Sequence, residues 1–432
     1  MEVSNILILV VSFVVLLFLR VPISFCIGMA TVLTMLPSIQ TIPALTTVAQ
    51  RMATGLDSFA LLAIPFFILS GQLMNHGGIA RRLIDFAKVL VGRLPGGLAF
   101  VNIVAAMLFG AVSGSAVAAA SAIGGFMSPI MEREGYDRDF SAAVNITSST
   151  TGLLIPPSNI LIVYSLASGG VSIAALFLAG YLPGLLVGLT LMLVAGFFAY
   201  RKNYPVGEKV AFAIALKRFW DSIPSLLLLV IVIGGIVAGI FTATEASAIA
   251  VLYTFILSVL IYKEVKWSQI PRILLDSAST TAIVMLLIAT SMGMSWIMSF
   301  ENIPQNMSEF LISFSDNKII ILLIINLILL FVGTFMDMTP AVLIFTPIFL
   351  PVAVQLGINP VHFGIILVLN LCIGICTPPV GNVLFVGCSI AKTSVVKVIR
   401  PLMPLFLAMI IALMIITYFP TLTMIVPRMF GY

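Results

Sequence analysis

Charge is scarce in this sequence. Asp, Glu, Lys and Arg together make up 9% of its 432 residues, against 61% for hydrophobic residues. Ordinary soluble domains carry about 25% charged residues, so the composition excludes a large soluble domain. Apolar runs of about 20 residues, the length that spans a bilayer as a helix, recur along the whole chain. We therefore predict an all-α polytopic membrane protein.

Histidine and cysteine are also rare. The two histidines, His76 and His362, are too few to complete a zinc or redox site with the cysteines, which we interpret as small packing residues. The four cysteines all lie in apolar segments: Cys26, Cys372, Cys376 and Cys388. The sequence lacks a phosphate-binding loop, so we expect neither ATP hydrolysis nor an organic cofactor. The net charge of +5 comes from short basic loops that orient membrane proteins, and no nucleic-acid partner is expected.

Two stretches place a double proline and then an asparagine inside long apolar segments, Gly152–Asn159 and Gly374–Asn382. Proline removes a backbone donor and ends an α-helix. A helix that ends inside hydrocarbon leaves free carbonyls, which is tolerated only beside protein or a water-filled cavity. Those oxygens and the Asn side chain suit a small hard cation such as Na⁺. A single break of this kind also fits a simple proline kink, so the interpretation depends on whether the two breaks are related.

An internal repeat relates the two breaks. The offset that carries Pro156 onto Pro378 also aligns three further pairs, without a gap. These pairs are Pro129 with Pro351, Gly135 with Gly357, and Ser113–Ser115 with Phe335–Asp337. Both triplets interrupt long apolar segments. Repeats with interrupted hydrophobic segments at matching places indicate the binding site of a transporter.

The basic residues predict how the two halves are oriented. Cytoplasmic loops are enriched in Lys and Arg, and the basic segments are 76–97, 201–222, 263–275 and 392–400. All of them share one side only if residues 98–131 and 319–353 enter the membrane and return as hairpins. One hairpin then opens inward and the other outward. The acidic loop that follows the span at 277–298 falls outside; its acids are Glu301, Glu309 and Asp316.

The predicted fold is therefore an inverted repeat with two re-entrant hairpins and two broken transmembrane helices. We divide the chain into scaffold helices with an interfacial arm at 1–56, transport half 1 at 57–168, scaffold helices with a connecting loop and a second arm at 169–275, transport half 2 at 276–391, and a C-terminal scaffold helix at 392–432. The N-terminal stretch has no small-residue cleavage site and is interpreted as an uncleaved helix. Thr242 and Glu245 have capping-box spacing, which we favour over an ion-binding role for Glu245.

Polar residues at the hairpin tips are candidates for the transport site. A helix that begins at Ser113–Ser115 offers free N–H groups and a partial positive charge to a carboxylate. At the other tip, Asp337 is an acid in an apolar region, which costs about 2.5–3.5 kcal/mol unless it is paired or hydrated. Either a role with cation and substrate or a hydrogen bond to the tip backbone accounts for Asp337. Thr339 and Thr377 add hydroxyl ligands, and the absence of a stacked Asp, Glu and His relay favours Na⁺ over H⁺.

Five motifs along the chain carry a family resemblance: Leu61–Gly71, Gly92–Gly97, Phe109–Ser115, Ile155–Ser158 and Phe241–Ala246. Together they resemble the large membrane subunit of tripartite ATP-independent periplasmic (TRAP) transporters, over nearly the full length. The resemblance implies an ion-transporter-superfamily fold and an elevator-type mechanism. It also implies sodium-driven uptake of an organic acid, of the sialic acid or C4-dicarboxylate type, across the bacterial inner membrane. The implied partners are a separate small four-helix membrane subunit, a periplasmic substrate-binding protein and membrane lipid.

The family pattern implies sodium ligation at the Ser113–Ser115 tip, at Ser158 and Asn159 and at the Thr377–Asn382 break, and the analysis of the second tip adds Asp337 and Thr339. Sodium binding is expected at Ser113, Gly114, Ser115, Ser158, Asn159, Asp337, Thr339, Thr377, Gly381 and Asn382. Substrate contacts are expected at Ser115, Pro157, Asp337 and Pro379. The second break carries an extra residue, Val380-Gly381 in place of Ser158, so the two ion sites need not be equivalent.

Two other classes of function remain open. A stand-alone sodium-coupled dicarboxylate or citrate carrier of the same superfamily would need no binding protein. A membrane-embedded enzyme would need convergent His, Asp, Glu or Cys groups, which the sequence does not bring together, and a channel would show flux without saturation. We therefore expect a transporter and not an enzyme.

Overall fold

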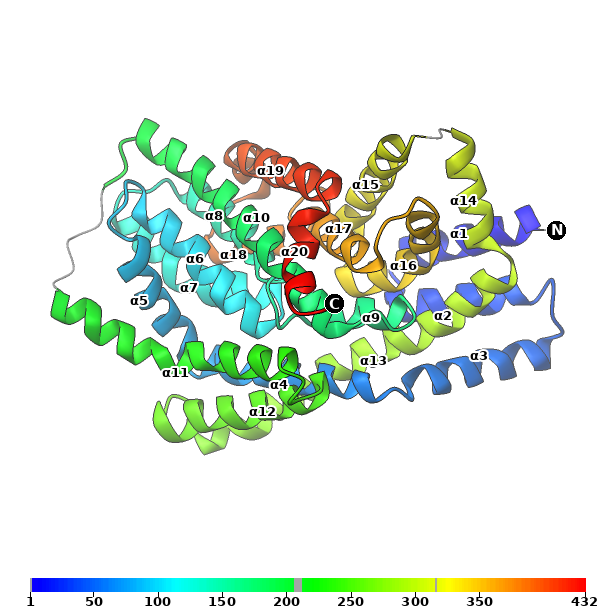
Figure 1. The fold of residues 1–432 in the computed structure, drawn as a ribbon, viewed down its shortest axis with the longest axis horizontal. Helices are drawn as coiled ribbons and strands as arrows, with labels where there is room; N and C mark the ends of the chain where they lie inside the picture. The colour runs from blue at the N-terminus through cyan, green and yellow to red at the C-terminus, as the bar shows by residue number, and fades with distance from the viewer. Residues whose placement is uncertain (1, 206–211, 315–316) are drawn as a thin grey trace.

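The computed structural model describes residues 2–205, 212–314 and 317–432. Within these ranges every regular element is a helix (Figure 1). Eight of the described helices are long and apolar enough to cross a membrane. The prediction of an all-α polytopic membrane protein is thus confirmed, while Asp316 of the acidic loop lies outside the described residues.

The first half begins with three helices and a short 3-10 turn, Phe59–Leu62, that leads into a fourth. Its helices are α1 Glu2–Phe18, α2 Ile23–Met35, α3 Thr41–Leu56, α4 Ala63–His76, α5 Ile79–Val91, α6 Gly97–Ser113, α7 Ala116–Arg133, α8 Arg138–Thr151, α9 Asn159–Ala167 and α10 Ile173–Arg201. The helices α6 and α7 form the first predicted hairpin. The helices α8 and α9 are the two pieces of the first broken span, separated by the double proline.

The second half follows the same order. Its helices are α11 Phe212–Val237, α12 Ala243–Phe255 continued by a π-helix at Ile256–Ile261, a 3-10 turn Trp267–Gln269, α13 Ile270–Phe300, α14 Ile303–Phe314, α15 Lys318–Phe335, α16 Met338–Gln355, α17 Pro360–Gly374, α18 Asn382–Ile390, α19 Val395–Tyr418 and α20 Thr421–Met429. The capping box at the start of α12 is present: Thr242 Oγ1 accepts from the N–H of Glu245, and the Glu245 carboxylate accepts from the N–H of Thr242.

Helix boundaries reproduce the offset read from the sequence. The offset between Pro156 and Pro378 also separates α7 from α16. The two helices begin at this offset from each other, and they end at it as well. In contrast, α18 begins and ends one position further from α9 than this offset predicts. The extra residue in the second break accounts for the difference.

Each hairpin also crosses its broken span at a pair of glycines. A Cβ added to Gly152 would lie 2.3 Å from Gly110 Cα, and one added to Gly374 would lie 2.4 Å from Gly333 Cα. The two halves therefore share their close packing as well as their order, because only glycine lets the backbones approach this far.

Several segments expected as loops are helical instead. The basic segment 76–97 contains α5, the acidic loop contains α14, the second arm runs without a break into α13, and α11 begins at Phe212 rather than near residue 223. In α5 the buried residues recur three or four positions apart: Ile79, Ala80, Leu83, Ile84 and Ala87. This period is typical of an amphipathic helix, and the dense charges on its other face concealed it.

Helices of the two halves interlock. The helix α2 packs against α13, and the equivalent helix of the other half, α12, packs against α4. In contrast, α10 and α19 pack against each other and against α8. Packing thus groups α10 and α19 with the hairpins and broken spans, whereas the sequence suggested that they belong to the scaffold.

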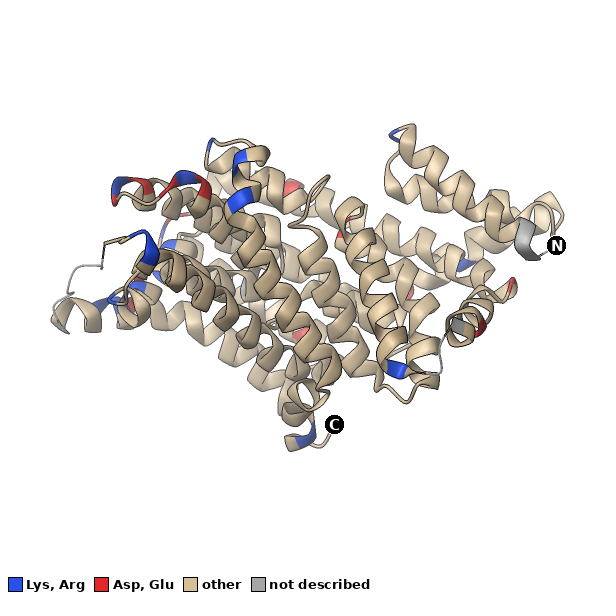
Figure 2. Cartoon of the chain, turned by 90° about the horizontal axis from the view of Figure 1, so that it is seen from above, with Lys and Arg blue, Asp and Glu red and all other residues tan. Residues whose placement is uncertain are grey.

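Lys and Arg gather mainly at one end of the molecule (Figure 2). Two contacts join the basic segments there: the Ser222 hydroxyl donates to the Arg82 carbonyl at 3.0 Å, and the Arg82 guanidinium stacks 3.5 Å from the ring centre of Tyr262. Arg82 and Ser222 therefore lie at the same end, next to Tyr262, where the second arm begins.

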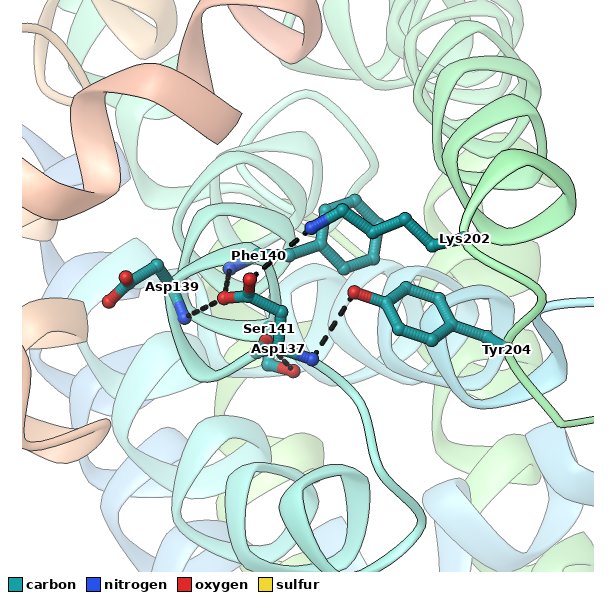
Figure 3. A network of polar contacts seen from close by, with 6 residues as sticks. All are labelled: Asp137, Asp139, Phe140, Ser141, Lys202 and Tyr204. Atoms are coloured by element: carbon teal, nitrogen blue, oxygen red, sulfur yellow. Dashed lines mark hydrogen bonds and ion pairs between the residues drawn. The ribbon is translucent and has the colours of Figure 1, made fainter.

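A polar network ties the turn after α7 to the turn after α10 at this end (Figure 3). Lys202 Nζ lies 3.2 Å from Asp137 Oδ2, and the Tyr204 hydroxyl accepts from the N–H of Asp137. The Thr393 hydroxyl donates to the carboxylate of Asp139. Burial alone raises the pKa of the Asp137 carboxyl, but hydrogen bonds from Lys202 and the N–H of Phe140 outweigh it and hold that pKa below its ordinary value. The turns after α7, α10 and α18 are thereby joined.

Candidate functional site

A cavity of about 200 Å³ lies where the two hairpin tips meet the two broken spans. The first hairpin contributes Gly114 and Ser115, and the second contributes Asp337 and Thr339. Each broken span contributes the asparagine after its double proline: Asn159 and Asn382. The repeat thus brings both halves to one site.

Four helices begin at this cavity: α7, α9, α16 and α18. A helix start presents N–H groups that the helix itself does not bond and carries about half a positive charge. The tips of the hairpins also pair with the opposite half, because α7 packs against α18 and α16 packs against α9. The cavity is therefore ringed by helix N-termini from both halves, an arrangement suited to an anion.

The first tip is shaped by Gly114 and Ser115. Gly114 ends α6 in the left-handed conformation with φ of 61°, which glycine adopts without strain. Ser115 then caps α7, its hydroxyl accepting from the N–H of Ala118 at 3.2 Å. Buried Ser113 donates to the Ser115 carbonyl at 3.4 Å and does not line the cavity. Its role as a sodium ligand stays a prediction.

Asp337 occupies the corresponding place at the second tip. It caps α16, and its Oδ1 accepts from the N–H of Met338 at 2.9 Å. Its side chain is nevertheless exposed toward the cavity. Both interpretations of Asp337 are therefore compatible: one oxygen holds the tip backbone, and the carboxylate still presents its charge to the site.

The breaks themselves are held by side chains that stay out of the cavity. The Ser158 hydroxyl is fully buried and donates to the Leu153 carbonyl at 2.5 Å, and the Thr377 hydroxyl donates to the Ile373 carbonyl at 2.7 Å. The Gly381 N–H reaches the Thr334 carbonyl of α15 at 3.3 Å. Pro157 and Pro379 flank the cavity without lining it, and both follow cis peptide bonds.

The two asparagines differ in their surroundings. The Oδ1 atom of Asn159 is buried and has no hydrogen-bond partner within the described residues, whereas the side chain of Asn382 is exposed. A buried amide oxygen without a donor costs about 1–3 kcal/mol. Asn159 therefore offers an oxygen that a cation or a ligand hydroxyl would satisfy, and the two sides of the site are not equivalent.

The electrostatics of the site are set by a single carboxylate and by the helix N-termini. Among the described lining residues Asp337 is the only ionisable one, and no Lys or Arg takes part. No group of three His, Cys, Asp or Glu side chains that could hold a metal is found in the described ranges. Any cation held here would therefore rely on backbone, hydroxyl and amide oxygens and on one carboxylate.

The far wall of the cavity was not anticipated from the sequence. It comes from two long helices, with Ile64 and Ile68 on α4 and Thr280 and Val284 on α13. Thr280 lies in a run of small polar residues, Ser277–Thr281, inside an otherwise apolar span, and this run is the signal that could have found the wall. The cavity thus lies between the hairpin tips and the helices α4 and α13.

Comparison with known proteins gives a consistent result. The family model described as "Tripartite ATP-independent periplasmic transporter, DctM component" matches residues 10–422. An uncharacterized Salmonella typhimurium protein, YgiK, is 58% identical over 99% of this chain and 98% of its own length. The C4-dicarboxylate TRAP transporter large permease protein DctM of Rhodobacter capsulatus is 39% identical over 95% of this chain and 96% of its own.

A solved structure shares the fold. The Alcanivorax borkumensis YdaH transporter superposes with a TM-score of 0.64 at 13% identity, covering 88% of each chain. The family match and the relatives place the chain among transport permeases rather than enzymes, as a multi-pass protein of the bacterial inner membrane. The protein therefore belongs to the DctM family, the large membrane permease of TRAP transporters for organic acids.

Proposed function

We propose that this permease takes up a small organic acid, driven by a sodium gradient, and that the cavity between the hairpin tips is its transport site. The acid would be delivered by a periplasmic substrate-binding protein. A small membrane subunit, expected as a separate chain, would brace the scaffold. The observation that carries the proposal is the meeting of four helix N-termini and one carboxylate in a single cavity.

The charge balance supports sodium coupling. The helix starts favour a carboxylate of the substrate, but Asp337 repels it. Two like charges about 4 Å apart repel by about 4 kcal/mol at an effective dielectric constant of 20. A sodium ion bound by Asp337 and neighbouring oxygens would remove this penalty, so the acid would bind well only when sodium is present.

The size of the cavity favours a small substrate. Pockets that enclose drug-sized ligands are about 300–1,000 Å³, and this one is about 200 Å³. A short dicarboxylate fits that space better than a nine-carbon sugar acid does. Of the two substrate types that the family suggests, we therefore favour the C4-dicarboxylate type, which is also the type named for the Rhodobacter relative.

The packing supports an elevator. The cavity has one wall on the hairpin group and the other on α4 and α13 of the scaffold, so sliding one body past the other would move the site across the membrane. We assign α6–α10 and α15–α19 to the moving body. The helices α5 and α14 would link this body to the scaffold, because α5 packs against α6 and α11, and α14 against α16 and α13. We also place the end that is rich in Lys and Arg in the cytoplasm.

Reconstitution tests the proposal directly. The chain would be placed in proteoliposomes with its small subunit, and succinate uptake would be measured with the binding protein outside and a sodium gradient imposed. We expect saturable uptake that needs both the gradient and the binding protein. Uptake without the binding protein would favour the stand-alone carrier, and uptake driven by a proton gradient alone would contradict sodium coupling.

A further inference from the structure

A second cavity, of about 520 Å³, lies at the end of the molecule where α15 begins. Three parts of the chain line it: the start of α15, the turn before α17, and the junction of α19 with α20. It shares no residue with the transport cavity. Neither the proposed transport step nor the resemblance to other permeases assigns it a role.

The cavity is basic. Lys318 and Arg428 both line it, no Asp or Glu does, and neither cation forms an ion pair within the described ranges. Lys318 is the first residue of α15, where the helix dipole disfavours a positive charge. The helix α17 also begins at this cavity, with Asn359 as its cap. A bound anion would offset the unfavourable interaction between Lys318 and the helix dipole, and it would neutralise both cations.

Internal hydrogen bonds hold the cavity together. The buried ring of His362 bonds to the Thr423 hydroxyl at 2.8 Å and to the Thr417 carbonyl at 3.3 Å. The Tyr418 hydroxyl donates to the Ile319 carbonyl at 3.0 Å. The three elements are therefore tied to one another, so the space between them is already formed before anything binds.

Apolar residues continue from the cavity along α15. Ile319, Leu322 and Met424 line the cavity itself. Outside it, exposed residues follow three or four positions apart along this membrane-spanning helix: Ile320, Leu323, Leu327 and Phe331. The helix α20 ends beside the cavity with exposed Met429 and Phe430. Exposed aromatic and basic side chains at the end of an apolar stripe are typical of the level where lipid headgroups meet water.

We propose that this cavity binds the headgroup of an anionic phospholipid, with its phosphate beside Lys318 and Arg428. One acyl chain lies along the exposed stripe of α15. A free anion would use the same cations, but it would leave the apolar part of the cavity and the stripe uncovered, so the lipid accounts for more of the surface. Because α15 and α19 belong to the body that we propose to move, the bound lipid would contact the transport machinery directly.

Native mass spectrometry of the full chain tests this site. The protein would be titrated in detergent with dioleoyl phosphatidylglycerol and, separately, with dioleoyl phosphatidylcholine. A basic side chain near a lipid surface strengthens binding about fivefold, so Lys318→Gln with Arg428→Gln should weaken phosphatidylglycerol binding about 30-fold. The matched control, Lys397→Gln with Arg400→Gln, removes the same charge from the other end of α19 and should retain wild-type binding.

Two outcomes would overturn the proposal. The first is equal retention of phosphatidylglycerol by wild type and by the Lys318/Arg428 variant. The second is displacement of the lipid by an equal concentration of inorganic phosphate, which would make this a site for soluble anions. All four substituted side chains are exposed, so each variant should fold, and an unchanged thermal unfolding temperature in detergent would confirm that it has.

Discussion

Gly114, at the tip of the first hairpin, lies directly against the side-chain amide of Asn159 in the first broken span. A Cβ added to Gly114 would stand 2.9 Å from Asn159 Nδ2, and the glycine has a φ of 61°. The same amide carries the buried Oδ1 atom that has no partner among the described residues. One glycine thus sets both the shape of the tip and the position of the oxygen that we propose as a sodium ligand.

Replacing Gly114 with alanine should damage the site. The left-handed conformation costs an alanine about 1–2 kcal/mol, and the added methyl group would push the Asn159 amide out of place. We expect a lower thermal unfolding temperature and a higher sodium requirement for uptake. Gly125→Ala is the control, because a Cβ there has nothing within 4 Å and alanine favours the helix. Equal sodium dependence in both variants would show that the tip does not position the asparagine.

Asn159→Ala should weaken sodium binding. It removes an amide oxygen, and a contact from a neutral group to a charged one contributes about 1.5–3 kcal/mol. The sodium concentration for half-maximal uptake should therefore rise roughly tenfold or more. Thr190→Ala serves as the control, since its hydroxyl bonds only to the Val187 carbonyl of its own helix. An unchanged sodium response in Asn159→Ala would show that this asparagine is structural.

Asp337→Asn separates the two roles of Asp337. Asparagine caps a helix as well as aspartate does, so the tip should fold and the thermal unfolding temperature should stay the same. The loss of charge should weaken the sodium dependence of uptake, because the substrate carboxylate would no longer be repelled by Asp337 when sodium is absent. Uptake should be measured across a range of sodium concentrations. If the variant keeps both its uptake and its sodium response, Asp337 is only a cap.

Cysteine labelling should verify the orientation. All four native cysteines are buried, so they should react little with the reagent, and labelling should report on the introduced cysteine. Arg81→Cys should react with a membrane-impermeant reagent only from the cytoplasm, and Glu309→Cys only from the periplasm. Both side chains are exposed, so access is governed by the side of the membrane. Labelling of both positions from the same side would contradict the inverted arrangement.

Crosslinking should test the motion. Thr339→Cys and Thr280→Cys place one thiol on each wall of the cavity, and a short crosslinker joining them should stop uptake until it is reduced. The control pair, Asp137→Cys with Lys202→Cys, joins α10 to the turn before α8. If α10 moves with the hairpins, this crosslink should leave uptake intact. Full uptake with the first pair locked would exclude an elevator.

Local sequence patterns predicted much of the fold. The double prolines located both breaks, because proline cannot continue a helix in any environment. The constant offset between the two halves correctly placed the caps Ser115 and Asp337 at equivalent positions. The hairpins followed from the need to keep basic loops on one side, and the structure joins Arg82 to Ser222 and Asp139 to Thr393 at one end.

Local sequence patterns were less informative about the partners of individual side chains and about the structure of charged segments. Ser158 and Thr377 were expected to bind an ion, which stays a prediction; the structure adds that each donates to a carbonyl of its own break. A hydroxyl next to a freed carbonyl bonds to it at almost no cost in chain entropy, and its oxygen keeps lone pairs for another partner. Similarly, the many charges in segment 76–97 suggested a loop, but its apolar residues recur at a helical period and the segment contains the helix α5.

The sequence by itself determined that the chain crosses the membrane, where its helices break, that its halves repeat, and which family it belongs to. These properties depend on hydrophobicity, proline and local spacing, which act over a few residues. Only the tertiary structure decided that Thr280 of α13 lines the same cavity as Thr339, that α10 packs with the hairpins, and that Lys318 and Arg428 share a cavity. Those relationships join residues far apart in the chain, and they are set by how whole helices pack, which no local pattern encodes.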